Sequence, residues 1–363
     1  MATALKEIYN EQYIKLLSSY IVLEYKDFDV ASFTLAVFEP KWSFKSLKER
    51  MRHISTTLHT FLPFSYKQSL EILQNVFLQM NEKKFALANM IFQDFVEVYG
   101  IQYFQISIEA LRIFTVHSSS EFAVRVFILH YEDEMMQVLQ EWAKDENEEI
   151  RRLASEGCRP RLPWAIALPR FQKDPSKILP ILEILKQDPS LYVRKSVANN
   201  LNDISKDNPH IVKEIIRKWY GQNEKTDWIL KHGARTLLKA GEREVLDMFG
   251  FVLRDDIILT AFSLPKSVMM GETLEFSFTL SSVKPLGKLR IEYKIDFKRQ
   301  NKRYLSKVFQ ISQGIYKERE KSFFKSYSFA KITTRKYYEG KHFLTLICNG
   351  VVLEKREFFL YKS

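Results

Sequence analysis

The chain has 363 residues, 46% of them hydrophobic, and a net charge of +11. This length exceeds what one hydrophobic core supports, so we expect two or three folded domains. The apolar runs are too short to cross a membrane, the N-terminus lacks a signal-peptide pattern, and the two cysteines, Cys158 and Cys348, exclude a disulfide framework. These features predict a soluble, cytoplasmic protein.

The sequence also lacks the motifs of common cofactor sites. It contains no CxxC or HExxH motif, its seven histidines are scattered, and no GxGxxG or Walker-type loop is present. Because metals need such ligand spacings and nucleotides need such phosphate-binding loops, we expect neither a metal site nor a nucleotide cofactor.

The positive charge is concentrated in the last third of the chain. Residues 258–363 contain 21 Lys and Arg against 9 Asp and Glu, a net charge of +12. The remaining residues contain 34 against 35, a net charge of −1. A basic module joined to a nearly neutral one favours a polyanionic partner, and a lysine-rich solubilising surface is the alternative.

Residues 1–120 place apolar residues three and four positions apart, which predicts helices. Three serines, Ser118 to Ser120, then precede Glu121 and an apolar run. This pattern predicts a serine-capped helix with Glu121 in its first turn, where the helix dipole favours an acid. Glu121 is therefore a candidate functional acid, and the alternative is that it serves only the helix start.

The segment from Ile150 to Trp164 combines a helical stripe with a stiff loop. Ile150, Leu153 and Ala154 predict a helix, which Gly157 is expected to end in a left-handed conformation and which two later prolines prevent from continuing. Charged and aromatic residues gather at this helix end, namely Arg151, Arg152, Glu156, Arg159, Arg161 and Trp164. Surface Arg–Glu pairs, which contribute little, are the alternative interpretation.

Three segments resemble one another: residues 148–157, 191–203 and 227–239. Each places an apolar residue, basic residues and small residues at helical spacing, and Arg151 and Arg194 are 43 positions apart. Helix pairs that repeat at such a period predict a HEAT-like α-solenoid.

In such a solenoid the second helix of each pair lines the concave face. A stripe of basic residues would recur along that face, namely Arg151, Arg152, Arg194, Lys195, Lys231 and Arg235. This stripe fits the backbone of a DNA duplex, and a protein-binding groove is the alternative.

From residue 258 onward the apolar period changes to two, which predicts about seven short strands. Asn349–Gly350 is a two-residue hairpin signal between two of them. Basic residues cluster at strand ends and loops, namely Lys284, Lys288, Arg290, Lys298, Arg299, Lys302 and Arg303. The predicted fold is mainly α: a HEAT-like-repeat α-solenoid at residues 1–250, followed by an all-β immunoglobulin-like sandwich at residues 258–363.

Three sequence words, SSSEFAVR, RRLASEGCRPRLPW and LYVRKSVANNLND, resemble in order and separation those of the AlkC family of bacterial DNA glycosylases. That family belongs to the HEAT-like-repeat alkylpurine glycosylases, and some members carry a C-terminal immunoglobulin-like domain. The resemblance is strongest from Ser118 to Gly241. It implies a helical-repeat enzyme with a basic β-domain, which agrees with the fold predicted above.

The resemblance also implies an activity. Such an enzyme excises cationic N3-methyladenine and N3-methylcytosine from duplex DNA by hydrolysing the N-glycosidic bond, without flipping the base, in base excision repair at the bacterial nucleoid. It would act as a monomer and without a cofactor. The implied catalytic residues are Glu121, Glu156, Asp203 and Trp164. The implied DNA-binding residues are Arg152, Arg159, Arg161, Arg194, Lys195, Lys231 and Arg235.

The chemistry of a cationic base agrees with these residue types. A positively charged base leaves without being protonated, so the enzyme has to stabilise a sugar that becomes oxocarbenium-like, which nearby carboxylates do. We favour Glu156 and Asp203 over Glu121 for this role, and Trp164 offers a π face to the cation. A non-catalytic DNA-binding solenoid and a protein scaffold with a β docking domain are the competing hypotheses.

Overall fold

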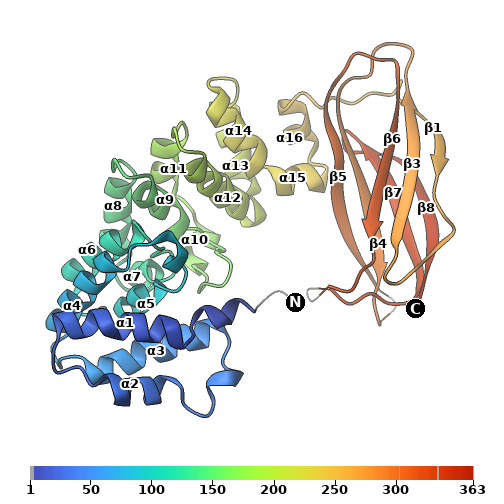
Figure 1. The fold of residues 1–363 in the computed structure, drawn as a ribbon. Helices are drawn as coiled ribbons and strands as arrows, with labels where there is room; N and C mark the ends of the chain where they lie inside the picture. Colours follow the sequence, from blue (N-terminus) through green and yellow to red (C-terminus); the bar gives the residue numbers. More distant parts are fainter. Residues whose placement is uncertain (1–3, 302, 333–334, 363) are drawn as a thin grey trace. The chain divides into compact units, whose positions relative to one another are not determined.

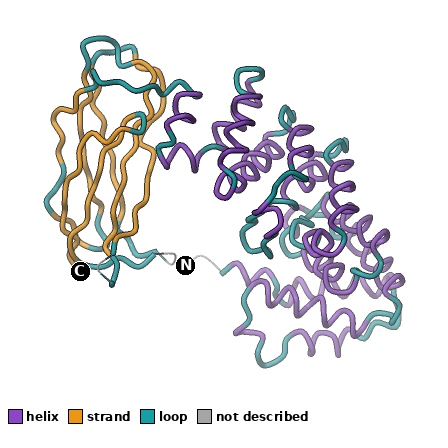
Figure 2. The backbone as a smooth tube through the Cα atoms, turned by 180° about the vertical axis from the view of Figure 1, so that it is seen from behind, coloured by secondary structure: helices purple, strands orange, loops and turns teal. Residues whose placement is uncertain are grey.

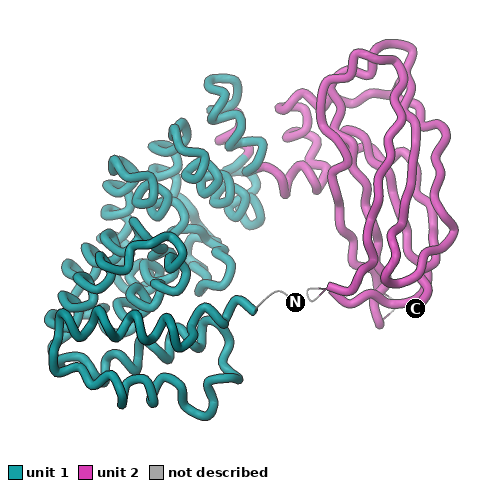
Figure 3. Tube along the Cα trace, in the orientation of Figure 1, with its two compact units in different colours: residues 1–212, 219–233 teal, residues 213–218, 234–363 magenta. Residues whose placement is uncertain are grey.

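The computed structural model describes residues 4–301, 303–332 and 335–362. The chain forms two compact units (Figure 3). The first comprises residues 1–212 and 219–233, and the second comprises residues 213–218 and 234–363. Within the described residues, sixteen α-helices precede eight β-strands (Figure 1). Helices and strands do not mix along the chain (Figure 2), so the predicted change from helical to strand periodicity is confirmed.

The first unit is built from helices that pack mainly on helices two or three places away in the chain. Short 3-10 turns lie at Leu5–Ile8, Trp42–Phe44 and Lys83–Phe85. The helices are α1 (Glu11–Glu24), α2 (Val30–Val37), α3 (Leu47–Phe61), α4 (Tyr66–Gln79), α5 (Met90–Tyr99), α6 (Phe104–Thr115), α7 (Val124–His130), α8 (Glu132–Trp142), α9 (Glu148–Gly157), α10 (Pro169–Lys173), α11 (Leu179–Leu185), α12 (Leu191–Asp207) and α14 (Glu224–Gly233). Helix α13 (Pro209–Trp219) crosses the division between the units.

The helical repeat is visible in one recurring contact. The Arg151 guanidinium donates to the carbonyls five and six residues before it, at 2.8 and 2.9 Å. Arg194, 43 positions later, donates to the two equivalent carbonyls at 2.8 Å. Each arginine thus closes the turn that leads into its own helix, α9 or α12. Arg151 also forms an ion pair with Asp188 at 2.6 Å, which ties one repeat to the next.

The strands form two sheets, with strand orders β1-β3-β6 and β2-β8-β7-β4-β5. Their bounds are β1 (Ile258–Ser263), β2 (Ser267–Met269), β3 (Thr273–Ser281), β4 (Gly287–Lys298), β5 (Tyr304–Tyr316), β6 (Glu320–Ser328), β7 (Gly340–Cys348) and β8 (Val351–Tyr361). Asn349 and Gly350 join β7 to β8 with φ angles of 48° and 79°, which two-residue hairpin turns require. The predicted hairpin is therefore confirmed.

Two short helices belong to the second unit, α15 (Arg235–Ala240) and α16 (Arg243–Met248). Arg243 donates to the Asn349 carbonyl at 2.8 Å, and the Leu246 side chain lies where a Cβ on Gly350 would stand. Because these contacts anchor the helices to the β7–β8 turn, the compact unit begins before the helices end. This differs from the division at residues 250–258 expected from periodicity.

One residue of the predicted basic cluster is not at the surface. Arg290 is buried on β4, where its guanidinium donates to Glu292 at 2.5 Å and to Gln313 at 2.7 Å. The prediction that Arg290 lies at a strand end or loop with the other cations was wrong, because it lies within β4, where five successive residues, 289–293, are buried on both faces of the strand. Lys284, Arg299 and Arg303 are exposed, and Lys302 lies outside the described residues.

Candidate active site

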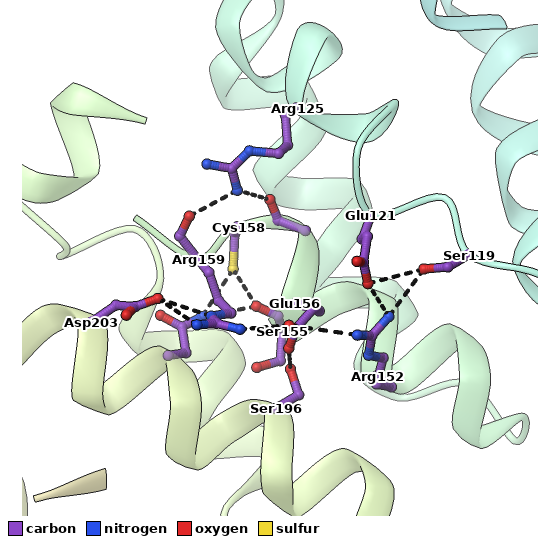
Figure 4. Close-up of polar contacts among 12 residues, drawn as sticks. Ser119, Glu121, Arg125, Arg152, Ser155, Glu156, Cys158, Arg159, Ser196 and Asp203 are labelled. Carbon is purple, nitrogen blue, oxygen red and sulfur yellow. Dashed lines mark hydrogen bonds and ion pairs between the residues drawn. The ribbon is translucent and has the colours of Figure 1, made fainter. Parts of the chain in front are cut away.

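Five charged side chains form a row of alternating sign inside the first unit. Glu121 pairs with Arg152, which lies 3.5 Å from Glu156. Glu156 accepts a hydrogen bond of 2.6 Å from Arg159, and Arg159 reaches Asp203 at 2.9 Å. Figure 4 shows these side chains following one another from α12 to the turn before α7. The structure thus brings together the three predicted acids, Glu121, Glu156 and Asp203.

The local sequence explains why these residues meet. Arg152 and Glu156 are four residues apart on α9, so they share one face of the helix, and Arg159 follows directly after its end. Asp203 comes from α12, which packs on α9. Glu121 lies in the turn before α7 rather than in its first turn as predicted, because the helix begins at Val124.

Polar side chains that the sequence reasoning missed complete the row. Ser196 donates to Glu156 at 2.6 Å, Lys206 donates to Asp203 at 2.9 Å, and Ser119 donates to Glu121 at 3.1 Å. A signal for Ser196 exists, since it lies seven residues before Asp203 and therefore on the same face of α12. These contacts satisfy the carboxylate oxygens and hold them in fixed positions.

The three acids differ in how far solvent can reach them. The side chains of Glu156 and Asp203 are 7% and 2% exposed, whereas the Glu121 side chain is 17% exposed. Burial alone would lower the pKa of Arg159, but its contacts with Glu156 and Asp203 outweigh burial and raise it. Both arginines of the row are therefore permanent cations, and together with Lys206 beside Asp203 they give the three carboxylates three cationic partners.

A buried arginine fixes the loop after α9. Arg125 is fully buried on α7 and donates to the carbonyls of Gly157, Arg159 and Ile166 at 2.9, 2.8 and 2.6 Å. Burial lowers its pKa to about 10, which still leaves it charged at neutral pH. A lone arginine in the apolar run FAVRVFIL was a signal for such a role. Burial likewise raises the pKa of Cys158 to about 12, so this thiol is a packing group rather than a nucleophile.

Gly157 serves close packing rather than the predicted left-handed exit. It is the last residue of α9, and its φ angle is not positive. A Cβ at this position would lie 2.6 Å from Val124 Cγ2 on α7. We therefore expect Gly157→Ala to destabilise the protein by about 1–3 kcal/mol, as overpacking does. Urea unfolding would measure this, and an unchanged midpoint would show that α7 and α9 separate freely.

Trp164 lies on the loop that Arg125 fixes. Its side chain is 69% exposed, and its backbone has a φ of 64°, a left-handed conformation that is unusual for a bulky residue. Its carbonyl accepts a hydrogen bond of 2.7 Å from Lys48 on α3. The indole is therefore presented to solvent from a loop whose backbone is tied down on two sides.

The predicted DNA-binding residues lie in different surroundings. Arg152 and Arg159 belong to the row, and Arg161 pairs with Asp207 at 2.6 Å. Arg194 lies 5.9 Å over the Trp228 ring in addition to its carbonyl contacts, and Lys195 is exposed on α12. Lys231 lies over Tyr220 in the first unit, whereas Arg235 begins α15 in the second unit. Their role in DNA binding stays a prediction.

Two absences in the described part of the chain bear on other kinds of site. It contains no group of three or more His, Cys, Asp or Glu side chains placed to hold a metal ion. No helix in the same residues is long and apolar enough to cross a membrane.

Comparison with known proteins identifies the class of enzyme. Residues 84–237, which include the row, match a model described as DNA alkylation repair enzyme. Residues 259–362 match a model described as the C-terminal Ig-like domain of the uncharacterised protein YhaZ. The β-sandwich is thus immunoglobulin-like, as predicted, and the helical unit is that of a DNA repair enzyme.

Two relatives cover nearly the whole chain. An uncharacterised protein of Bacillus subtilis, YhaZ, is 45% identical over 98% of each chain. The structure of the alkylpurine DNA glycosylase AlkC of Pseudomonas fluorescens, bound to DNA containing an abasic site analog, is 36% identical, covers 99% of each chain and superimposes with a TM-score of 0.93. The chain belongs to the AlkC family of DNA glycosylases.

Proposed function

We propose that this protein hydrolyses the N-glycosidic bond of N3-methyladenine and N3-methylcytosine in double-stranded DNA. The observation that carries the proposal is the row of Glu121, Arg152, Glu156, Arg159 and Asp203, which holds three carboxylates close together in fixed positions. Both bases carry a positive charge, so they leave without protonation, and what remains to be stabilised is the cationic sugar. The DNA bound in the AlkC structure supports DNA as the partner.

The three acids stabilise the cationic sugar electrostatically. A carboxylate held about 4 Å from a positive charge in a partly buried site stabilises it by about 4 kcal/mol. Because Ser196, Lys206 and the two arginines fix the oxygens beforehand, little reorganisation is needed when the bond breaks. Glu121 is the most accessible of the three acids and is therefore best placed to contact the sugar directly. Glu156 and Asp203 act on the sugar from positions farther along the row.

We propose that Trp164 lies against the damaged base. An exposed indole offers its π face to a cationic ring, which is worth about 0.5–2 kcal/mol and favours a charged lesion over a neutral one. The base can then remain stacked in the DNA helix, because a cationic base leaves without a proton donor beside it. The buried acids Glu156 and Asp203 need not reach the base either, since they already contact Arg159. This departs from enzymes that must extrude the base to reach it.

The basic sandwich gives a prediction of its own. We propose that its exposed cations hold DNA phosphates, and each contact contributes about 0.9 to the slope of log affinity against log salt concentration. Neutralising Lys284, Arg299 and Arg303 together to glutamine is expected to weaken duplex binding and reduce that slope by about 2–3. Fluorescence anisotropy at several salt concentrations measures both quantities.

The matched control neutralises three exposed lysines of the helical unit, Lys15, Lys26 and Lys67, and removes the same total charge. If the two triple variants reduce the slope equally, the sandwich contributes only net charge and does not hold the duplex.

Identification of the released base tests the proposed activity. Duplex DNA treated with a methylating agent, and oligonucleotides carrying a single N3-methylcytosine, are incubated with the protein, and free bases are separated and identified by mass. We expect both N3-methylated bases to be released. Duplex binding without release would instead support a non-catalytic DNA-binding protein, and the absence of both binding and release would support a scaffold.

A further inference from the structure

Lys48 links three parts of the helical unit. It lies in the first turn of α3, which begins with a capping box between Ser46 and Glu49. Its ammonium donates to the Trp164 carbonyl at 2.7 Å and lies 4.5 Å over the ring of Phe122. Phe122 directly follows Glu121. One cation therefore contacts both the loop that carries the indole and the turn that carries the most accessible acid.

The Trp164 loop is also held by Arg125 and by the pairs of Arg159 with Asp203 and Arg161 with Asp207, which lie on the N-terminal side of Trp164 or contact other carbonyls. Arg125 binds the carbonyls of Gly157, Arg159 and Ile166, but the Trp164 carbonyl accepts from Lys48. Trp164 also holds the sparsely populated φ of 64°, a conformation that persists only where the surroundings impose it. Without Lys48, the carbonyl would turn to solvent and the backbone could relax to a negative φ.

We propose that Lys48 is a positioning residue for excision: it holds Trp164 in its left-handed conformation and thereby sets the distance between the indole and the Glu121 turn. The inference depends on the proposed role of Trp164 in the preceding section. Lys48 acts on the reaction through Trp164 and Phe122, and it does not need to touch the DNA. A misplacement of such a group by about 1 Å can cost up to about 100-fold in rate.

A double-mutant cycle tests this coupling in the full-length protein. Lys48→Met keeps the length of the side chain but loses the charge and the donor. We expect it to lower the single-turnover excision rate about tenfold in the native background, and less than about twofold in the Trp164→Ala background. Lys48→Arg, which retains a donor, should recover most of the rate.

Equal losses in both backgrounds would overturn the proposal, because Lys48 would then act independently of Trp164, for example on a phosphate. Lys45→Met is the matched control. It removes the same charge three residues earlier, where Lys45 pairs with Glu39 at 2.8 Å, and it should leave the rate unchanged. An equal effect of Lys45→Met would assign the loss to net charge and would also overturn the proposal.

A second readout does not require activity. Hydrogen exchange of the peptide spanning residues 158–168 should become faster in Lys48→Met, while exchange in α9 stays the same, because only the loop loses an anchor. Unchanged loop exchange would contradict positioning even if the protein excises bases. Faster loop exchange in a protein that releases no base would instead retain the structural link and contradict the proposed function.

Discussion

Replacing Glu156 with glutamine is expected to lower the single-turnover rate of base excision about 100- to 1,000-fold, comparable to the loss of one preorganised electrostatic group in other enzymes. Glu156 occupies the centre of the row, between Arg152 at 3.5 Å and Arg159 at 2.6 Å. The amide is nearly the same size and can still accept the hydrogen bond from Ser196. What it lacks is the negative charge, so the row loses one of its three anions.

The measurement uses enzyme in excess over a duplex with one N3-methylated base, so that the rate reports bond cleavage rather than product release. Duplex affinity should change by less than about threefold, because a carboxylate that is 5% exposed contributes little to phosphate contacts. Glu141→Gln, at an exposed position on α8, is the control and should behave as the native protein. If the Glu156→Gln variant excised the base at the native rate, Glu156 would have only a structural role.

Comparing the three acids would also decide between direct and indirect action. The sequence favoured Glu156 and Asp203, because both follow a basic repeat segment. The exposures point to Glu121 as the acid that can approach the sugar. If Glu121→Gln loses more rate than Glu156→Gln and Asp203→Asn loses least, distance to the sugar determines the contribution of each acid, as Coulomb's law requires.

Periodicity was sufficient to predict the architecture. The 43-residue spacing of Arg151 and Arg194 reflects a real structural repeat, since the two guanidiniums make equivalent contacts. Asn349–Gly350 forms the expected turn, because only residues that tolerate a positive φ fit there. These features depend on local spacing and backbone sterics, which the sequence displays directly.

The partners of charged side chains could not be predicted in the same way. Arg159, which is predicted to bind DNA phosphates, lies between two acids that the sequence did not predict as its partners, and Arg290, which was predicted at a strand end or loop, is buried against Glu292. Both outcomes depend on which way a side chain turns after a helix end or along a strand, and distant elements decide that. Gly157 shows the same limit, since Val124, 33 residues away in the sequence, explains it better than helix termination does.

Arg159→Met is expected to destabilise the folded protein by about 3–5 kcal/mol, the range for breaking a buried ion pair by removing one partner. Arg159 is 7% exposed, and its loss leaves Asp203, at 1% exposed, with only Lys206 as a cation. Glu156 keeps Ser196 and the more distant Arg152. Two nearly buried carboxylates then face each other without the guanidinium that separates them, which is unfavourable by both desolvation and repulsion.

Arg161 offers a closely matched control on the same loop. It forms a bidentate pair with Asp207, one helical turn after Asp203 on α12, but its side chain is 42% exposed. Arg161→Met is therefore expected to cost only about 0–1 kcal/mol. Urea unfolding of the two variants compares one buried and one exposed pair between the same two elements, and equal losses would show that burial does not determine the strength of this contact.

Adding Asp203→Asn to Arg159→Met separates charge from packing. If the destabilisation comes from an unpaired buried carboxylate, the double variant should recover a large part of the stability lost by Arg159→Met, because the amide is neutral. If it comes instead from the missing side-chain volume, Asp203→Asn will restore nothing. Recovered stability without recovered excision would show that the anions beside the sugar are retained for catalysis, and that Arg159 is what allows them to remain charged inside the folded protein.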